Sequence, residues 1–371
     1  MRDVIVIGGG IIGCAAAAML AERGVRVTLV EATAIGAGAS GRNLGAVQHP
    51  YDPILEPLFD ASVADYATLD GLGFPPEPAG LLLLSTDADG LRARTDALRA
   101  TLPHLDPTFH QRADLLEPCL GPDVSAMRLE TAYPIPPHAA TAAWASRAGR
   151  GGVELRVGAA AALHGRGVVL ETGERLDADA ILVAAGPWTP AIIDPSGRWQ
   201  PIRRTWGVTL ALDLPLAAHH VMEEAEIDDA IVGGAVRWSV PGERQALFSL
   251  AVAGGRATLG STFFPDEPDP AEAVPLLLQR GEGFVPGLAA AAVRDIRACA
   301  RPQSVDGRPF IGPLPGREGM FVCAGHGPWG ISTGPASARL VVDAMLGTRD
   351  RPIPPELSAA RFEPGASAPR G

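Results

Sequence analysis

Residues 4–31, VIVIGGGIIGCAAAAMLAERGVRVTLVE, contain the pattern that decides the fold. The β-branched run 4–7 is followed by glycines, then by the alanine-rich stretch 11–23, and then by a second apolar run, 25–30. This order predicts a strand, a tight turn, a helix and a second strand. A strand–helix–strand unit of this length is the minimal parallel crossover. The sequence therefore predicts an α/β fold that contains a parallel sheet.

Three glycines between the first strand and the helix form a G-x-G-x-x-G pattern: Gly8, Gly10 and Gly13. The first allows a tight bend, the second lets the backbone approach a pyrophosphate, and the third lets the helix pack closely on the strand. The helix N-terminus then presents N–H groups and partial positive charge to the phosphates. Glu31, 18 residues after Gly13, is placed to bind a ribose 2′-hydroxyl, and its charge disfavours a 2′-phosphate. The motif predicts NAD or FAD without choosing between them.

Composition excludes several other classes of protein. Residues 4–21 form an uncharged run, but the four glycines within it fit a strand and a helix better than a membrane span. The 371 residues carry a net charge of −11, which argues against nucleic acid and anionic membrane as main partners. The chain has no lysine, which excludes a lysine Schiff base and a Walker-A phosphate loop.

The four cysteines are scattered along the chain, so they suggest neither a disulfide framework nor a zinc site. This use of cysteine fits a reducing compartment. We therefore expect a cytoplasmic protein with no transmembrane segment and no bound metal.

Apolar runs and chain breakers beyond residue 31 predict the remaining elements. We expect helices over 54–72, 91–102, 139–150, 274–284 and 334–346, with buried strands over 80–85, 180–185 and 320–324. Residues 153–157 and 168–171 are expected to form short strands, and residues 103–122 to be irregular. Several short runs between residues 203 and 262 indicate a mainly antiparallel sheet.

Two further segments favour FAD over NAD. Residues 36–43, GAGASGRN, form a small, polar loop directly after the acidic residue, and such a loop can pass close to a second nucleotide moiety. Residues 325–332, GHGPWGIS, precede the last long helix. A reduced flavin carries negative charge at its pyrimidine end, and a helix N-terminus aimed there would stabilise it.

Three separated blocks make the sequence similar to the D-amino-acid oxidase-like FAD-dependent oxidoreductases, which include glycine oxidase, sarcosine oxidase and D-amino-acid dehydrogenase. The blocks are residues 3–45, 180–188 and 299–347; the last contains R-P-x-x-x-D-G-x-P-x-I-G from Arg301 and A-G-H-G from Ala324. The resemblance implies a Rossmann-like FAD-binding domain with a parallel sheet, formed by residues 1–75, 138–202 and 293–371. It also implies an inserted, mainly antiparallel α+β substrate domain, formed by residues 76–137 and 203–292.

The resemblance further implies the chemistry. Family members oxidise the CH–NH bond of an amino or imino acid by hydride transfer to flavin N5, which leaves an imine that water hydrolyses. Arg301 matches the family's carboxylate-binding arginine, and a guanidinium can hold a carboxylate with two charge-assisted hydrogen bonds. The alternative for Arg301 is a structural ion pair.

The motif and the resemblance together assign the residues that contact FAD. These are Gly8, Gly10, Ile11, Ile12, Gly13, Glu31, Ala32, Ala39, Ser40, Arg42, Asn43, Leu44, Gly45, Ala161, Ala185, Gly186, Trp188, Gly327, Gly330, Ile331 and Ser332. We expect FAD to be held noncovalently. The alternative is a covalent link at Cys299, which lies seven residues before Asp306, the spacing at which sarcosine oxidase-like proteins attach FAD.

Other site candidates follow from the resemblance. His326 matches a loop that lies over the flavin, as a hydrogen-bonding group, a base or only a helix cap. His49 falls near a segment that faces the flavin in sarcosine oxidase-like enzymes, although a surface histidine fits as well. Trp329, Trp206 and Tyr133 are candidate aromatic walls of the substrate pocket, with Trp329 alternatively a core residue.

The electron acceptor stays open at this point. Several sarcosine oxidase-like members resemble one another in using a lysine near the flavin to assist reaction with dioxygen, and this chain has none. Dioxygen, a quinone or an electron-carrier protein are therefore all candidate acceptors, with His326 or His49 as a substitute positive group. Two other functions remain as alternatives: oxidation of a 2-hydroxy acid with His326 as base, and an FAD-bearing subunit of a multi-subunit electron-transfer complex. A homo-oligomer also stays open.

Overall fold

The computed structural model describes residues 1–214, 217–225, 246–349 and 352–362. The first elements confirm the predicted crossover: β1 (Asp3–Ile7), α1 (Ile11–Glu22) and β2 (Arg26–Glu31). Strands β1 and β2 pair in parallel, with Val4 opposite Val27. The apolar run at residues 4–21 is therefore a buried strand followed by a buried helix. Among the described residues, no helix is both long enough and apolar enough to cross a membrane.

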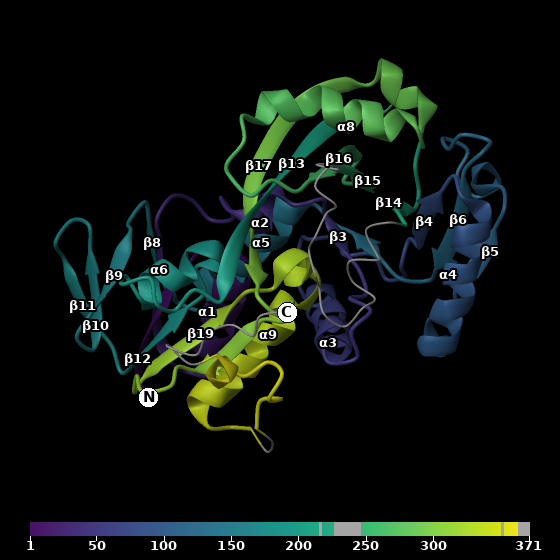
Figure 1. Cartoon of the computed structure of the whole chain (residues 1–371). Helices are drawn as coiled ribbons and strands as arrows, with labels where there is room; N and C mark the ends of the chain where they lie inside the picture. The colour runs from purple at the N-terminus through teal and green to yellow at the C-terminus, as the bar shows by residue number, and fades with distance from the viewer. Residues whose placement is uncertain (215–216, 226–245, 350–351, 363–371) are drawn as a thin grey trace.

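A six-stranded sheet is built around β1 and contains the predicted parallel pairs (Figure 1). Its order is β18-β19-β12-β1-β2-β8, and every neighbouring pair is parallel except β18 with β19. The strands added to β1 and β2 are β8 (Glu154–Val157), β12 (Ala180–Val183), β18 (Phe310–Pro313) and β19 (Met320–Ala324). The predicted strand at 320–324 is confirmed at both ends.

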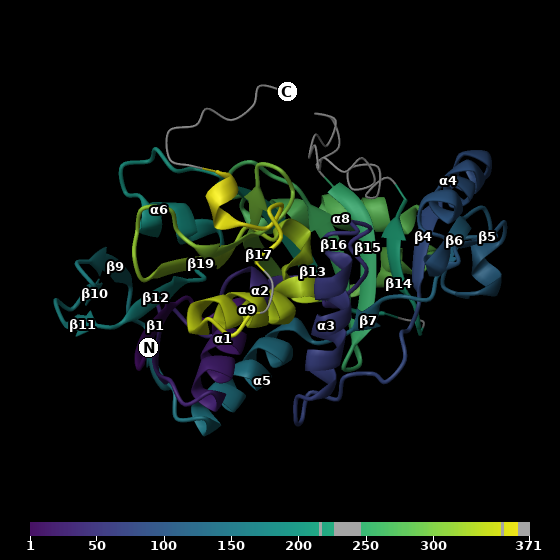
Figure 2. The same cartoon turned by 90° about the horizontal axis from the view of Figure 1, so that it is seen from below.

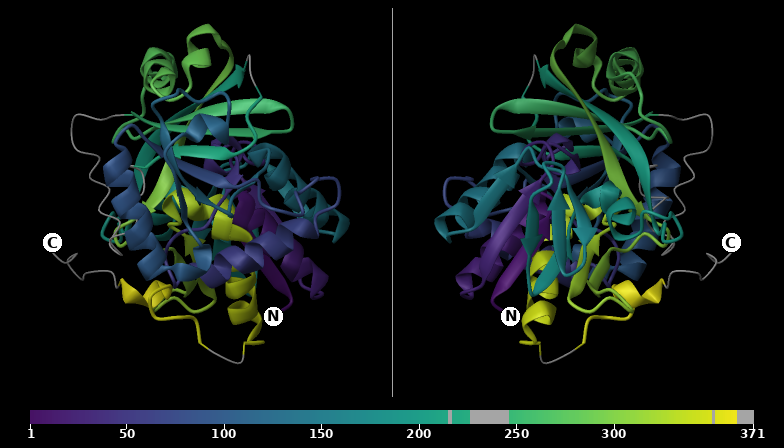
Figure 3. Two further views of the ribbon diagram at one scale, coloured as in Figure 1. Left: turned by 90° about the vertical axis from the view of Figure 1, so that its right-hand side faces the viewer. Right: turned by 90° about the vertical axis from the view of Figure 1, so that its left-hand side faces the viewer.

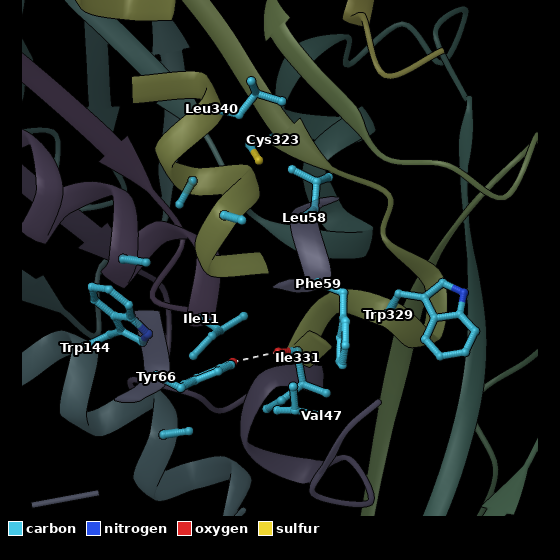
Figure 4. Packing of buried hydrophobic residues seen from close by; sticks show 14 of the residues in the cluster. Ile11, Val47, Leu58, Phe59, Tyr66, Trp144, Cys323, Trp329, Ile331 and Leu340 are labelled. Carbon is cyan, nitrogen blue, oxygen red and sulfur yellow. Dashed lines mark hydrogen bonds between the residues drawn. The ribbon is translucent and has the colours of Figure 1, made fainter. Parts of the chain in front are cut away.

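A cluster of helices covers one side of this sheet. Helices α1, α3, α5 and α9 lie side by side in Figure 2, where α9 contacts both α1 and α3. Apolar side chains from these helices form one large buried cluster (Figure 4). The added helices are α3 (Glu56–Ala67), α5 (Pro137–Arg150) and α9 (Gly330–Leu346).

An eight-stranded, mainly antiparallel sheet forms the second layer. Its order is β17-β13-β16-β15-β14-β4-β6-β5, and only β14 and β4 pair in parallel. The strands are β4 (Leu81–Ser85), β5 (Thr108–His110), β6 (Ser125–Leu129), β13 (Ile202–Asp213), β14 (Val221–Glu224), β15 (Ala246–Ala253), β16 (Arg256–Thr262) and β17 (Ala292–Ser304). Helix α8 (Ala273–Glu282) covers the face turned away from the six-stranded sheet (Figure 3).

Short elements complete the described fold. Strands β9 (Ala161–His164), β10 (Gly167–Leu170) and β11 (Arg175–Asp177) form a small antiparallel sheet, and β3 (Ala46–Val47) pairs with β7 (Tyr133–Pro134). The remaining helices longer than a single turn of 3₁₀ are α2 (Ala39–Arg42), α4 (Ala88–Thr101) and α6 (Thr189–Ile193).

Two expectations about the elements were wrong: the irregular chain at residues 108–110 and the start of the last helix. Residues 108–110 form the edge strand β5 where irregular chain was expected, because pairing with β6 supplies the order that the sequence does not. The last helix begins at Gly330 and contains Pro335, which was expected near its start. Residues 293–304, expected in the FAD-binding domain, form most of β17 and pair with β13 in the eight-stranded sheet. Part of the expected strand region, residues 215–216 and 226–245, lies outside the described residues.

Candidate functional site

A large cavity lies where the carboxyl ends of β1, β2 and β12 face the eight-stranded sheet. Its volume is about 1380 Å³. In parallel α/β sheets, ligands bind beyond the carboxyl ends of the strands. Most of the predicted FAD contacts line this cavity: Gly8, Gly10, Ile11, Ile12, Glu31, Ala32, Ala39, Ser40, Arg42, Asn43, Leu44, Ala161, Ala185, Gly186, Trp188, Gly327, Gly330 and Ile331. Gly13, Gly45 and Ser332, also predicted to contact FAD, are not part of the lining.

The glycine turn has no room for side chains. Gly8 has φ of +114°, and a Cβ there would lie 2.5 Å from the carbonyl oxygen of Ala184 on the neighbouring strand. A Cβ at Gly13 would lie 1.9 Å from the carbonyl oxygen of Gly8. These contacts give the physical reason for two of the three glycines: α1 packs directly on the turn, and the turn packs directly on the end of β12.

Polar contacts organise the start of α1. Ser40 Oγ accepts a hydrogen bond from the N–H of Ile11 over 2.9 Å, in the first turn of the helix. The two carboxylate oxygens of Glu31 accept from the backbone N–H groups of Gly9, over 2.7 Å, and Thr33, over 2.9 Å. Each carboxylate oxygen can accept more than one hydrogen bond. Glu31 is therefore fixed at the cavity wall and still able to bind a ribose hydroxyl.

The loop after Glu31 is shaped by Asn43 and Gly45. The Asn43 amide donates to the carbonyl oxygens of Ala39 and Ser40, and its oxygen accepts from the N–H of Gly45. Gly45 has φ of +87°, and a Cβ there would lie 2.5 Å from the carbonyl oxygen of Ile135. These contacts hold the small loop 39–45 against the cavity.

His326 lines the opposite part of the cavity, just before α9. It is buried, and neither ring nitrogen has a hydrogen-bond partner. Burial lowers the pKa of His326 to about 3, so the imidazole is neutral at pH 7. It therefore does not supply the positive charge considered as a substitute for lysine. Two orphaned buried nitrogens at a cavity wall fit a site that a bound polar ring would complete.

Arg301 lies on β17 and extends over Gly207 of β13. Its Nη1 donates to the carbonyl oxygen of Thr262 over 2.9 Å, and its guanidinium lies 4.7 Å from the centre of the Phe263 ring. Burial lowers the pKa of Arg301, yet a guanidinium stays charged at neutral pH. No carboxylate within the described parts of the chain forms an ion pair with it. Its remaining donors therefore line the cavity without an ion-pair partner among the described residues.

Cys299 also lines the cavity, two residues before Arg301 on β17. Burial raises the pKa of its thiol, although Arg301, Arg42 and Arg297 oppose this effect. The thiolate is the nucleophilic form of cysteine. Cys299 thus lies at the cavity wall, but its buried surroundings keep the thiol protonated.

Two predicted site residues, His49 and Tyr133, do not line the cavity. His49 is buried beside α3, where its ring packs 5.5 Å from that of Phe59, and burial lowers its pKa. Its Nδ1 accepts from the N–H of Tyr51, so the neutral ring carries its proton on Nε2, which faces Glu56 at 3.7 Å. In this tautomer the Nε2 proton of His49 points to Glu56. His49, Glu56 and His104 lie close enough together to hold a metal ion, but the protonated Nε2 of His49 has no lone pair for one.

Of the three aromatic candidates, two line the cavity and one does not. Tyr133 stacks on Phe74 with ring centres 5.0 Å apart, away from the lining. Trp206 and Trp329 both line the cavity, and Trp329 is also almost completely buried beside the apolar cluster (Figure 4). Trp329 therefore lines the cavity and is also part of the buried core.

Several polar residues of the lining were missed by the sequence analysis, among them Gln48, Glu223 and Arg297. Gln48 directly precedes His49, so the correct segment was considered but the adjacent residue was chosen. Glu223 and Arg297 reach the cavity through strand pairing, which leaves no local signal in the sequence.

Residues 3–344 match the family model described as FAD dependent oxidoreductase. The chain belongs to this family. The fold agrees with that membership, and FAD is the cofactor of the family. Residues of the glycine turn, Glu31 and most of the loop 39–45 line the cavity.

Curated relatives and solved structures extend the comparison. The chain is 28% identical over 369 residues to the glycine oxidase of Pseudomonas aeruginosa, covering 93% of this chain and 94% of that protein. Among solved structures, glycine oxidase from Geobacillus kaustophilus superposes with a TM-score of 0.81 at 24% identity, covering 98% of this chain and all of that one. Iminodiacetate oxidase from Chelativorans sp. BNC1 superposes with a TM-score of 0.77, also at 24% identity, covering 96% and 98% of the two chains.

Proposed function

We propose that this FAD-dependent oxidoreductase oxidises the CH–NH bond of a small amino or imino acid that Arg301 holds by its carboxylate. The observation that carries the proposal is a guanidinium without a counter-ion, in the same cavity as the dinucleotide-binding turn. The relatives named glycine oxidase and iminodiacetate oxidase act on molecules that carry both an amine and a carboxylate. Their names support the substrate class proposed for this chain.

FAD, when bound, accepts the hydride and so supplies the redox chemistry of the reaction. The residues that would hold it are those of the glycine turn, Glu31, the loop 39–45 and the start of α9. Arg301 would orient the substrate through two charge-assisted hydrogen bonds, each contributing about 1.5–3 kcal/mol. Buried side chains such as Trp329 would exclude water from the reacting carbon.

A 2-hydroxy acid is the weaker alternative substrate. Its oxidation needs a base to take the hydroxyl proton, and His326 was the candidate. With a pKa lowered to about 3 by burial, neutral His326 is a poor proton acceptor at pH 7. An amine can instead reach its reactive neutral form by losing one proton, without a strong base.

An anaerobic substrate screen tests the proposed function. Amino, imino and 2-hydroxy acids are added to the holoenzyme, and loss of the yellow absorbance of the oxidised flavin records its reduction. We expect amino or imino acids to bleach the flavin and hydroxy acids to leave it oxidised. Bleaching by hydroxy acids alone would contradict the proposal, and no bleaching until a co-purified partner is added would favour the electron-transfer subunit.

The electron acceptor is a separate part of the proposal. The chain has no lysine, and His326 is neutral, so neither supplies a positive charge to assist dioxygen. We infer that a quinone or carrier protein accepts the electrons faster than dioxygen does. Turnover under air and turnover with an artificial acceptor decide this; equal rates would identify an oxidase. We also place the enzyme in the reducing cytoplasm, because its four cysteines are unpaired and buried.

A further inference from the structure

Glu223 is a buried carboxylic acid in the cavity wall, on a different strand from Arg301. It lies on β14, is 6% exposed and lines the same cavity. Its cross-strand partners are Leu83 of β4 and Ser249 of β15, so these three side chains share one face of the eight-stranded sheet. That face is the one packed toward the six-stranded sheet, because Leu83 belongs to the same apolar cluster as α1 and α9.

The next residue, Glu224, shows how a buried glutamate of this sheet is ordinarily neutralised. Its side chain lies on the opposite face, where it forms an ion pair with Arg280 of α8 and accepts a hydrogen bond from the N–H of Phe248. Glu223 differs from it. Its one hydrogen bond within the described residues comes from the neutral amide of Gln48, over 3.2 Å, and none of the described arginines or histidines pairs with it.

Gln48 adds a second acceptor beside Glu223. Its amide nitrogen donates to the Glu223 carboxylate, so its oxygen points elsewhere, and that buried Oε1 has no hydrogen-bond partner. The backbone N–H of Gln48 donates to Ser332 Oγ over 3.0 Å, which fixes the residue at the first turn of α9. At the end of the cavity where α9 begins, Gln48 Oε1 therefore lacks a donor, and the Glu223 carboxylate has only a neutral donor.

We propose that Glu223 and Gln48 form the amine subsite: they bind the ammonium group of the substrate, and the Glu223 carboxylate takes one proton from it. One N–H bond of the substrate breaks and one O–H bond of Glu223 forms, so the ammonium becomes a neutral amine and the carboxylate a neutral acid, with no change in oxidation state. This inference rests on the proposed amine oxidation and adds the group that prepares the amine.

The subsite defines the substrate class more narrowly. The ligand must carry a carboxylate for Arg301 and a protonated primary or secondary amine for Glu223 and Gln48. A hydroxy acid would leave the carboxylate of Glu223 without a cation, and a second carboxylate at this place would be repelled. Burial raises the pKa of Glu223 to about 7, which suits a group that exchanges a proton near neutral pH.

Ligand discrimination provides the first test. Glycine and propanoate are suitable probes, because one carries an ammonium group where the other carries a methyl group. Both are added anaerobically to the holoenzyme in a stopped-flow instrument, and flavin absorbance records binding. We expect the wild type to bind glycine at least ten-fold more tightly than propanoate, and Glu223→Gln to lose that preference. Glu224→Gln is the matched control, since it removes a neighbouring buried charge from the other face and should keep the preference.

The pH dependence of flavin reduction provides the second test. Without a proton acceptor, the amine must lose its proton to water, so reduction in Glu223→Gln should require a pH closer to the pKa of the free amine, about 9–10. We expect a loss of ten-fold or more at pH 7 that shrinks at pH 10, and partial recovery in Glu223→Asp. A merely structural role would lower the rate equally at every pH.

The outcomes separate this inference from the proposed function. If amino acids reduce the wild-type flavin and Glu223→Gln matches the wild type in its pH profile and its preference for glycine, the amine subsite is wrong and the proposed function stands. If the wild type shows no preference for glycine over propanoate, the subsite is also wrong. If only hydroxy acids reduce the wild-type flavin, the proposed function itself fails.

Discussion

The hydroxyl of Tyr66 donates a hydrogen bond to the carbonyl oxygen of Ile331 over 2.7 Å, which joins α3 to the first turn of α9. Ile331 lies four residues before Pro335, and proline has no N–H for the helical bond that this carbonyl would otherwise accept. Tyr66 is fully buried, and Figure 4 shows its side chain directed at the helix. A tyrosine from another helix thus replaces the missing backbone donor at the end of α9 that lines the cavity.

Tyr66→Phe should lower the free energy of unfolding by about 1–3 kcal/mol, because a buried carbonyl oxygen loses its partner. Pro335→Ala restores a backbone N–H at that position, so the same Tyr66→Phe change should cost less in the Pro335→Ala background. Urea unfolding of the four FAD-loaded proteins measures the coupling. Additive effects of the two substitutions would show that the hydroxyl does not act in place of the backbone N–H.

This contact also explains why the start of α9 could not be predicted from the sequence. Proline is common at the first position of a helix, so the sequence indicated a helix that begins at Gly334-Pro335. The helix begins at Gly330 instead. Its first turn is stabilised by Tyr66, which is 265 positions from Ile331 in the sequence. Local patterns contain no information about such a partner.

The cofactor half and the substrate half of the candidate site also differ in how far the sequence could predict them. The glycine turn and Glu31 are close in sequence, and their spacing alone indicated a dinucleotide. Glu223 and Glu224 are adjacent and chemically identical, and only the pairing of β14 with β15 decides which one faces the cavity. A shift of one residue would exchange their faces, so the sequence could not distinguish them. Arg301 was found because the family motif marks it, not because of its own surroundings.

Arg301→Ala should weaken the use of carboxylate substrates by roughly 10- to 100-fold, a loss of about 1.4–2.7 kcal/mol. The reason is that the substrate carboxylate loses its cation. The rate constant for flavin reduction at low substrate concentration measures the effect, and an unchanged FAD content shows that the fold is intact. Kinetics identical to the wild type would remove Arg301 from the substrate site.

Gly207→Ala tests the placement of Arg301 without removing its charge. A Cβ at Gly207 would lie 2.4 Å from Nη1 of Arg301, so the guanidinium has to move. We expect a loss of affinity for carboxylate ligands of about ten-fold, close to that of one charge-assisted hydrogen bond. Gly149→Ala is the matched control, since a Cβ there would meet nothing within 4 Å. Equal affinity in Gly207→Ala and the control would mean that the carboxylate binds elsewhere.

Acid precipitation of the holoenzyme should release all of its yellow colour. Burial raises the pKa of the Cys299 thiol, so little of the nucleophilic thiolate forms near neutral pH. We therefore expect FAD in the supernatant, in equal amounts from the wild type and from Cys299→Ser. Colour that stays with the wild-type precipitate but leaves the Cys299→Ser precipitate would identify a covalent link at this residue.

Glu223 should make the protein less stable as the pH rises. Burial raises the pKa of Glu223 in the folded protein to about 7, from 4.5 for an exposed glutamate. Between these two values the folded state keeps a proton that the unfolded state releases, so the free energy of unfolding falls as the pH increases through this window, by at most about 3 kcal/mol. Glu223→Gln is neutral in both states and should remove this part of the pH dependence.

Urea unfolding with excess FAD at pH 5 and pH 8 measures the difference. The variant should gain stability relative to the wild type between pH 5 and pH 8, whereas Glu224→Gln, which breaks the ion pair with Arg280, should show no such gain. Parallel pH curves for the wild type and Glu223→Gln would mean that Glu223 is already ionised in the folded protein, and that a cation not seen in the described residues neutralises it.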